Sequence, residues 1–423
     1  GVAARLVGEC PYRGLAAFQE QDAAVFFGRE GQAARLVMML EPPLAAAAVV
    51  GASGSGKSSL VFAGLLPRLR GQQSWIIAHC RPGSQPFQAL AAALAPILEP
   101  ALSETDRLVE AGKLARALSE RNLSLGDVAA RLLEKRAGAR RVLLVVDQFE
   151  ELYTLGVDPA VRQQFLDALA EAARPARSAG SAPYGQTYVS APDRGATCLS
   201  LLLTLRADFM AQALACRPIA DLLQEAALFL GPMTREELRE AIARPAERQG
   251  ATFEPGLVER ILEDVGEEPG SLPLLEFCLT LLWERQANGW LTHAAYEQIG
   301  QVEGALARYA EDVFGQLDEP DRDRARQVFV QLVRPGESTE DTRRVATRVE
   351  IGEANWPLTR RLADSRLVVT GREAGSGYEM VEVAHEALIQ RWERLRTWLA
   401  TDRAFRSWQE GLRAALHQWE AAG

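Results

Sequence analysis

A glycine-rich stretch, GASGSGKSS from Gly51 to Ser59, places the strongest constraint on this chain. It follows the apolar run Leu44 to Val50 and precedes LVFAGLLPRL, which has a helical pattern. A strand, a glycine turn and a helix in this order bring successive backbone N–H groups and a positive helix end to one point, which suits a phosphate group. The stretch fits G-x-x-x-x-G-K-[ST], so Lys57 would contact the β- and γ-phosphates and Ser58 would bind Mg2+.

Lysine is rare in this chain, which makes a chance match to the pattern improbable. Of the 47 Lys and Arg residues only three are lysines, at positions 57, 113 and 135, and 44 are arginines. A glycine turn with no ligand is the structural alternative. None of the three lysines follows Asn or Thr, so the guanine-reading pattern [NT]-K-x-D is absent and ATP is the favoured nucleotide.

The first half of the chain alternates short apolar runs with helical patterns, which is typical of a parallel sheet with crossover helices. We expect strands at Leu44 to Val50, Trp75 to Cys80, Val142 to Val146, Leu199 to Leu205 and Leu228 to Leu230. The Pro-, Gly- and Ser-rich stretch 174–197 has no periodicity and reads as a mobile loop insertion. The predicted fold class is therefore an α/β P-loop NTPase domain.

Helical patterns dominate after Gly231. Thr234 and Glu237 have the spacing of a capping box that would begin a helix. RLVVT and YEMVEVA flank a glycine-containing turn and predict a hairpin after helices, as in a winged helix. We predict a nucleotide-binding domain at 1–231, an all-helical domain at 232–301, a winged-helix domain at 302–400 and a C-terminal helix at 401–423 that leads to a missing domain.

A phosphate loop needs a carboxylate at the end of another buried strand to hold the metal, and Asp147 follows the apolar run Val142 to Val146. Glu150 and Glu151 lie just beyond it. Either could orient or deprotonate an attacking water, and an acidic helix start is the alternative; we choose Glu150. Arg206 follows the fourth predicted strand, where its guanidinium could sense the γ-phosphate; a surface arginine is the alternative.

The joint order of several motifs resembles the STAND class of P-loop NTPases, relatives of the NACHT and NB-ARC switches, and the bacterial branch often joined to WD-repeat propellers. FFGRE looks like hhGRE, VLLVVDQFEE is similar to hhhhDGhDE, LTLRADF to the sensor strand, PGSLPLLEF to the GxP motif, and VAHEAL to the winged-helix histidine segment. Gln148 stands at the usual glycine position of the acidic motif, and Glu386 replaces an aspartate. The resemblance covers almost the whole chain.

The resemblance implies roles for individual residues. Asp147 would hold the metal with Ser58, Glu150 would be the base, Pro273 would pack near the adenine and His385 would contact the β-phosphate of ADP. The residues alone leave open whether His385 binds nucleotide or has a purely structural role. The expected catalytic residues are Lys57, Asp147, Glu150 and Arg206; the expected nucleotide-binding residues are Phe27, Gly28, Arg29, Gly51, Gly54, Ser55, Gly56, Lys57, Ser58, Ser59, Pro273 and His385.

The resemblance also implies a function. The chain would be a slow regulatory ATPase, closed with ADP, that opens and forms a homo-oligomer with ATP to relay a signal to a fused effector, with defence or cell-death signalling as the setting. A DNA-binding initiator or transcription-regulating ATPase is the second possibility. A sensor domain such as a β-propeller and an effector domain are the expected missing partners, since the chain begins at Gly1 and reads as part of a longer protein.

Composition sets further expectations. The formal net charge of −9 disfavours broad phosphate neutralisation, so nucleic acid is not expected as a partner. No apolar run approaches the roughly 18 residues that span a bilayer, and five cysteines lack CxxC spacing, so we expect a cytoplasmic protein without a membrane partner.

Overall fold

Two compact units make up the chain. The computed structural model describes residues 7–41, 46–155, 157–173, 198–266, 271–334, 341–372, 378–401, 403, 408 and 412. One unit spans Ala17–Glu237, and the other combines Gly1–Ala16 with Leu238–Gly423. The domain boundaries predicted at 231 and 301 divide the chain more finely than these two units and stay predictions. The segment up to Ala16, which we assigned to the nucleotide-binding domain, belongs instead to the second unit. The predicted loop insertion 174–197 lies outside the described residues.

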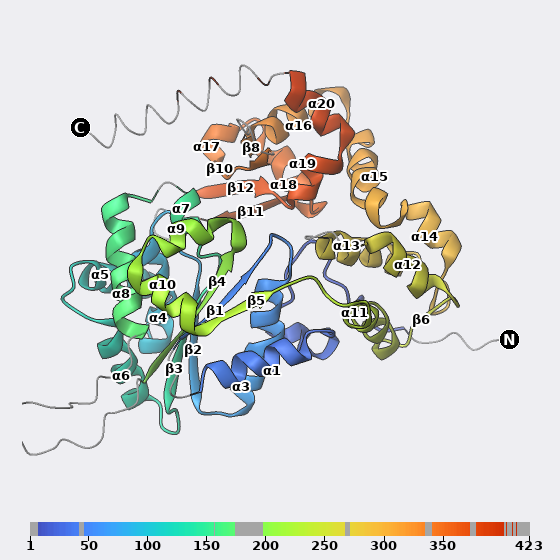
Figure 1. Ribbon diagram of the computed structural model, residues 1–423. Helices are drawn as coiled ribbons and strands as arrows, with labels where there is room; N and C mark the ends of the chain where they lie inside the picture. The colour runs from blue at the N-terminus through green and yellow to red at the C-terminus, as the bar shows by residue number, and fades with distance from the viewer. Residues whose placement is uncertain are drawn as a thin grey trace, which may run out of the picture. The chain divides into compact units, whose positions relative to one another are not determined.

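A five-stranded sheet forms the centre of the first unit (Figure 1). Its order is β2-β3-β4-β1-β5, and every pair in it is parallel. The strands are β1 Ala46–Gly51, β2 Trp75–Cys80, β3 Arg141–Val146, β4 Leu199–Arg206 and β5 Ala227–Leu230. The five predicted strands are thus confirmed, with no end shifted by more than two residues, and so is the α/β fold class.

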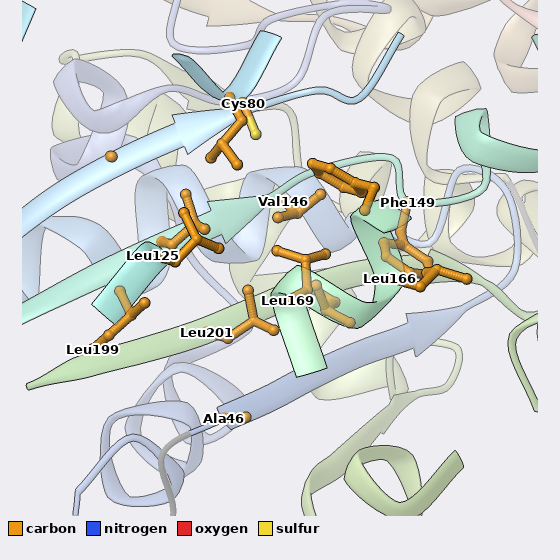
Figure 2. Close-up of a cluster of buried hydrophobic side chains, with 14 of the residues drawn as sticks. Ala46, Cys80, Leu125, Val146, Phe149, Leu166, Leu169, Leu199 and Leu201 are labelled. Atoms are coloured by element: carbon orange, nitrogen blue, oxygen red, sulfur yellow. The ribbon is translucent and has the colours of Figure 1, made fainter. Parts of the chain in front are cut away.

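Helices cover both faces of this sheet. They are α1 Glu30–Met39, α2 Lys57–Ser59, a π-helix Leu60–Leu65, α3 Leu66–Gly71, α4 Pro86–Leu98, α5 Glu104–Ser119, α6 Leu125–Lys135, α7 Glu151–Thr154, α8 Pro159–Ala173, α9 Met210–Leu214 and α10 Arg217–Ala226. Because strand side chains alternate between faces, β3 contributes Leu144 to a core with α4, α5, α6, α8 and α10, and Leu143 to a core with α1 and α3. Figure 2 shows part of the larger core, with Leu166 and Leu169 of α8 near Val146.

The second unit is mainly helical. Its elements are α11 Arg235–Arg248, which begins just before the boundary, β6 Thr252–Phe253, α12 Leu257–Val265, α13 Leu272–Glu284, β7 Trp290–Leu291, α14 His293–Ile299, α15 Gln301–Gly315, α16 Glu319–Gln331, β8 Val333–Arg334, β9 Thr342–Arg343, β10 Ala346–Thr347, α17 Arg348–Ile351, α18 Trp356–Asp364, β11 Val368–Arg372, β12 Glu379–Val383, α19 Glu386–Arg391 and α20 Glu393–Thr401. Strands β11 and β12 form the predicted hairpin, with β10 on the other side of β12. The winged-helix assignment stays a prediction.

The start of α11 follows the predicted capping box. The Glu237 backbone N–H donates to Thr234 Oγ1 at 3.2 Å, and the Thr234 N–H donates to Glu237 Oε2 at 2.9 Å. Two otherwise unpaired N–H groups are satisfied reciprocally, which fixes where the helix begins.

Aromatic packing joins the last two described helices to the rest of the second unit. Trp392, between α19 and α20, packs edge-to-face with Phe314 of α15 and Phe329 of α16. Leu395 and Leu399 of α20 are buried, so the apolar positions of this helix serve packing. The predicted C-terminal helix 401–423 lies almost wholly outside the described residues. None of the described helices is both long enough and apolar enough to cross a membrane.

Candidate nucleotide-binding site

The glycines of the phosphate loop are required by its backbone. Gly54 and Gly56 have φ angles of +70° and +86°, a region that residues with a Cβ rarely adopt. Gly51 ends β1, and a Cβ there would lie 2.8 Å from the Leu230 carbonyl oxygen of β5. The sequence therefore selects a tight loop of fixed shape between β1 and α2.

Lys57 is held against this loop. Its side chain is buried, and Nζ donates to the carbonyl oxygens of Gly51 at 3.0 Å and Ala52 at 2.7 Å. Burial lowers the pKa of Lys57, and the charge of Glu150 opposes that shift. An ammonium that is costly to bury but retained suits a site that receives an anion.

The Ser55 hydroxyl also fits an oxygen-rich ligand. Its Oγ is buried and has no hydrogen-bond partner among the residues that the structure describes. A buried polar group without a partner costs on the order of 1 to 3 kcal/mol, so such groups usually mark a function. A phosphate seated in the loop would satisfy it.

The two candidate metal ligands come together across the sheet. Ser58 Oγ donates to Asp147 Oδ1 at 2.8 Å, and Asp147, at the carboxyl end of β3, is 1% exposed. Magnesium prefers oxygen ligands and is usually held by one or two protein groups together with phosphates and water. This hydroxyl and carboxylate fit that requirement, and within the described part of the chain no group of three or more His, Cys, Asp or Glu residues forms a separate metal site.

Asp147 has two further partners, which the sequence did not predict. Thr204 Oγ1 donates to Asp147 Oδ1 at 2.7 Å, and Arg81 Nε lies 3.3 Å from Oδ2. Thr204 is a hydroxyl inside the apolar run of β4, and Arg81 directly follows β2. The rule that sites gather at the carboxyl ends of parallel strands could have found Arg81.

Glu150 and Glu151 have different surroundings. Glu150 Oε2 accepts a hydrogen bond from the backbone N–H of Arg206 at 3.2 Å, and burial raises the pKa of Glu150. Glu151 Oε2 accepts from the backbone N–H of Gly83 at 2.9 Å. Glu151 thus holds the loop after β2, and Glu150 holds the end of β4; the choice of Glu150 as the base stays a prediction.

Gln148 shows why the resembling motif has glycine at this position. Its φ angle is +56°, and its backbone N–H donates to Thr204 Oγ1 at 2.9 Å. A positive φ costs a residue with a Cβ roughly 1 to 2 kcal/mol, which glycine avoids. The chain keeps the backbone geometry despite the glutamine.

The Arg206 guanidinium lies beside an acid and a ring. One of its terminal nitrogens donates to Asp208 Oδ2 at 2.7 Å, and its carbon lies 5.8 Å from the centre of the Phe209 ring. Arg206 therefore emerges at the same sheet edge as Asp147, as expected from the end of β4.

The FFGRE segment forms a tight turn ahead of α1. Gly28 has φ +84°, and a Cβ there would lie 2.4 Å from the Glu237 carbonyl oxygen. Arg29 is buried and donates to the Gly231 carbonyl oxygen at 2.8 Å, and burial lowers its pKa. Arg29 thereby fixes the chain after β5, and Phe27 beside it is half-buried.

Ser59 has a partner inside the protein. The backbone N–H of Phe18 donates to Ser59 Oγ at 3.2 Å. This contact links the segment before the FFGRE turn to the helix after the phosphate loop, so Ser59 has a structural partner beside its predicted nucleotide role.

Pro273 and His385 belong to the second unit. Pro273 lies in the first turn of α13, where its missing N–H is harmless. His385 caps α19: its Nδ1 accepts from the Ala387 N–H at 3.1 Å, and burial, followed by the charge of Arg343, lowers its pKa to about 4. The imidazole is therefore neutral at pH 7. The nucleotide contacts of Pro273 and His385 stay predictions.

A family model described as Novel STAND NTPase 1 matches residues 11–423. The chain belongs to this family. The resemblance inferred from the motifs is thereby confirmed, and this STAND protein is a nucleotide-binding NTPase. No curated protein matches it.

Three solved structures that are similar to this STAND protein have sequence identities of 14–17% to it. They include the Aeropyrum pernix ORC1 protein in complex with DNA (17% identity, 90% of this chain and 94% of that chain, TM-score 0.44). The Walker-type ATPase PABY2304 of Pyrococcus abyssi (14%, 89% and 97%, 0.42) and Cdc6p of Pyrobaculum aerophilum (14%, 88% and 94%, 0.40) are others.

One expectation needs correction. Nucleic acid was not expected as a partner, but the similar structures include one with DNA bound, so that exclusion is wrong. The error lies in using net charge, because a sum over 423 residues sets no limit on the charge of one local surface.

Proposed function

We propose that this STAND protein is a regulatory switch operated by ATP and ADP with Mg2+. The observation that carries the proposal is the set of groups around the loop: Lys57 on its inner carbonyls, the partnerless Ser55 hydroxyl, and Ser58 on Asp147. Together they offer a cation, a hydrogen-bond group and two oxygen ligands to a polyphosphate with its metal. An NTPase of this family is expected to turn over slowly when its product is a change of state.

Hydrolysis would divide the work among five residues. Lys57 would hold the β- and γ-phosphates, and Ser58 with Asp147 would hold Mg2+, which neutralises phosphate charge when bound. Glu150 would orient the attacking water and accept its proton; burial raises its pKa, which makes it a better base than an exposed glutamate. Arg206 would sense the γ-phosphate by leaving Asp208 for it.

The switch itself needs contacts that differ between the two nucleotide states. Moving an equilibrium from 1:99 to 99:1 takes about 5.5 kcal/mol, and a charge-assisted hydrogen bond contributes roughly 1.5 to 3 kcal/mol. Two to four contacts therefore suffice. Arg206 on the γ-phosphate of ATP and His385 on the β-phosphate of ADP are our candidates for two of them. With ADP the protein would be closed; with ATP it would open, form an oligomer and relay a signal to a fused effector.

The test of nucleotide binding is the Lys57→Ala variant in isothermal titration with ATP and with ADP. We expect the affinity for both to fall at least about a hundredfold, which corresponds to roughly 2.7 kcal/mol. Lys113→Ala is the matched control, because Lys113 is exposed and pairs with Glu110 on the surface of α5. Unchanged affinity in Lys57→Ala would refute the assignment of the site.

The nucleotide that co-purifies with the chain tests the switch. We expect ADP on a monomer, and a larger mass by light scattering after exchange for a non-hydrolysable ATP analogue. Equal masses in the two nucleotides would contradict the coupling of nucleotide to assembly, while leaving nucleotide binding itself intact.

A further inference from the structure

Arg81 forms an ion pair with Asp147, the carboxylate that would hold the metal. Arg81 follows β2, and its Nε lies 3.3 Å from Asp147 Oδ2. The exposures of the two side chains differ sharply, at 52% for Arg81 and 1% for Asp147. One partner is therefore a buried charge, and the other reaches it from the solvent side.

The other carboxylate oxygen of Asp147, Oδ1, accepts hydrogen bonds from two hydroxyl groups. Oδ1 accepts from Ser58 Oγ at 2.8 Å and from Thr204 Oγ1 at 2.7 Å. Both donors are neutral, so among the described residues that bond to the Asp147 carboxylate only Arg81 brings a full positive charge. A buried carboxylate without a compensating cation is strongly disfavoured. Arg81 therefore stabilises Asp147 whenever no metal is bound.

The loop that carries Arg81 is anchored, but the side chain is not enclosed. Gly83 has φ +59° and donates its backbone N–H to Glu151 Oε2 at 2.9 Å. This bond fixes the loop against the acidic segment after β3. With about half of its surface in water, the guanidinium can leave Asp147 by side-chain rotation while the loop backbone stays in place.

We propose that Arg81 is an internal counter-cation that competes with Mg2+ for Asp147. The inference rests on the proposed nucleotide site and adds a regulatory property to it. Two cations on one carboxylate repel each other, so Mg2+ and the Arg81 guanidinium compete for Asp147. The exchange sets the Mg2+ concentration at which nucleotide is retained and keeps the protein stable when the metal is absent.

The experiment measures the binding of a fluorescent ADP analogue to the full chain across Mg2+ concentrations, starting from EDTA. Arg81→Gln should lower the Mg2+ concentration at half-maximal effect by about three- to tenfold, because the competitor is gone. Arg81→Lys keeps a positive charge and should stay close to the wild type. Arg140→Gln is the control. Arg140 is exposed and lies just before the start of β3, whereas Asp147 follows the end of that strand.

Thermal unfolding gives a second readout that does not depend on binding. In EDTA, Arg81→Gln should melt at a lower temperature than the wild type, and Mg2+ with ADP should narrow that gap. In an Asp147→Asn background, Arg81→Gln should have no effect on either measurement, because the two residues act through one contact.

The outcomes separate this inference from the proposed function. A wild-type chain that responds to Mg2+ together with an Arg81→Gln variant of equal or weaker Mg2+ affinity would overturn the counter-cation while leaving the nucleotide site standing. A wild-type chain whose nucleotide binding ignores Mg2+ would overturn the metal site and the inference with it.

Discussion

The backbone N–H of Arg206 donates a hydrogen bond to Glu150 Oε2 at 3.2 Å. This bond joins the end of β4 to the segment after β3, so the backbone that carries the candidate γ-phosphate sensor also positions the carboxylate of the candidate base. A displacement of the Arg206 backbone would be transmitted to the Glu150 carboxylate, whereas rotation of the guanidinium alone would leave this bond in place.

The first prediction concerns that carboxylate. Glu150→Gln should lower the rate of ATP hydrolysis by about 10²- to 10⁴-fold and leave ATP affinity nearly unchanged, because general base catalysis is lost while the loop is intact. Phosphate release and calorimetry check the two quantities. Glu151→Gln is the control, since Glu151 bonds to the Gly83 N–H and should retain most of the activity. Equal losses in both variants would contradict the assignment.

Asp147→Asn should chiefly weaken the response of nucleotide binding to Mg2+. The amide keeps hydrogen-bonding capacity toward Ser58 and Thr204 but loses the charge that attracts a metal. Nucleotide affinity measured in Mg2+ and in EDTA should converge in the variant. An undiminished difference between the two conditions would remove Asp147 from the metal site.

His385 allows its structural role to be separated from the predicted contact with ADP. His385→Ala should lose about 1 kcal/mol because it removes the acceptor that caps α19. His385→Asn keeps an acceptor at the cap but removes the imidazole. If the imidazole holds ADP, light scattering in ADP should show a larger species for both variants, with reduced stability only for alanine. A wild-type monomer in both would refute the contact.

Glu276 predicts a dependence of stability on pH. This residue of α13 accepts a hydrogen bond from the Arg13 N–H at 3.2 Å, and burial raises its pKa to about 8. In the unfolded chain a glutamate titrates near pH 4.3, roughly. Because the folded pKa is the higher one, its contribution to the free energy of unfolding is full below about pH 4 and is lost as pH rises through 8, by at most about 1.4 kcal/mol per unit.

Denaturant unfolding between pH 5 and pH 9, roughly the window set by this shift, checks this prediction. Glu276→Gln should flatten the decline, whereas Glu9→Gln, at an exposed position, should follow the wild type. A Glu276→Gln variant whose stability falls as steeply as that of the wild type would show that another group titrates.

Local sequence patterns were enough to predict the α/β unit. Its central strands β1, β3 and β4 are buried on both faces and read as apolar runs, and the carboxyl ends of β3 and β4 brought Asp147 and Arg206 to one edge. The capping box at Thr234 was equally readable, because its two bonds span only three residues.

The position of Arg81 after a strand can be read locally, but which partner a side chain reaches depends on contacts that no local pattern encodes. Arg81 reaches Asp147 across 66 residues, and Phe18 reaches Ser59 across 41. The placement of the first residues in the second unit rests on bonds such as that from Tyr12 Oη to the Ile242 carbonyl oxygen, 230 positions away. Such pairs are decided by tertiary packing.

Along the sequence, the α/β unit from Ala17 to Glu237 is inserted between the two segments that form the helical unit. A fragment from 17 to 237 would carry every strand of the parallel sheet and the whole phosphate loop. A fragment that starts at 238 would leave behind the buried Tyr12 and the Arg13 partner of Glu276. An excised second unit therefore needs residues 7–16 spliced back through a linker, and a protease cut after Glu237 would leave those residues covalently attached to the α/β unit.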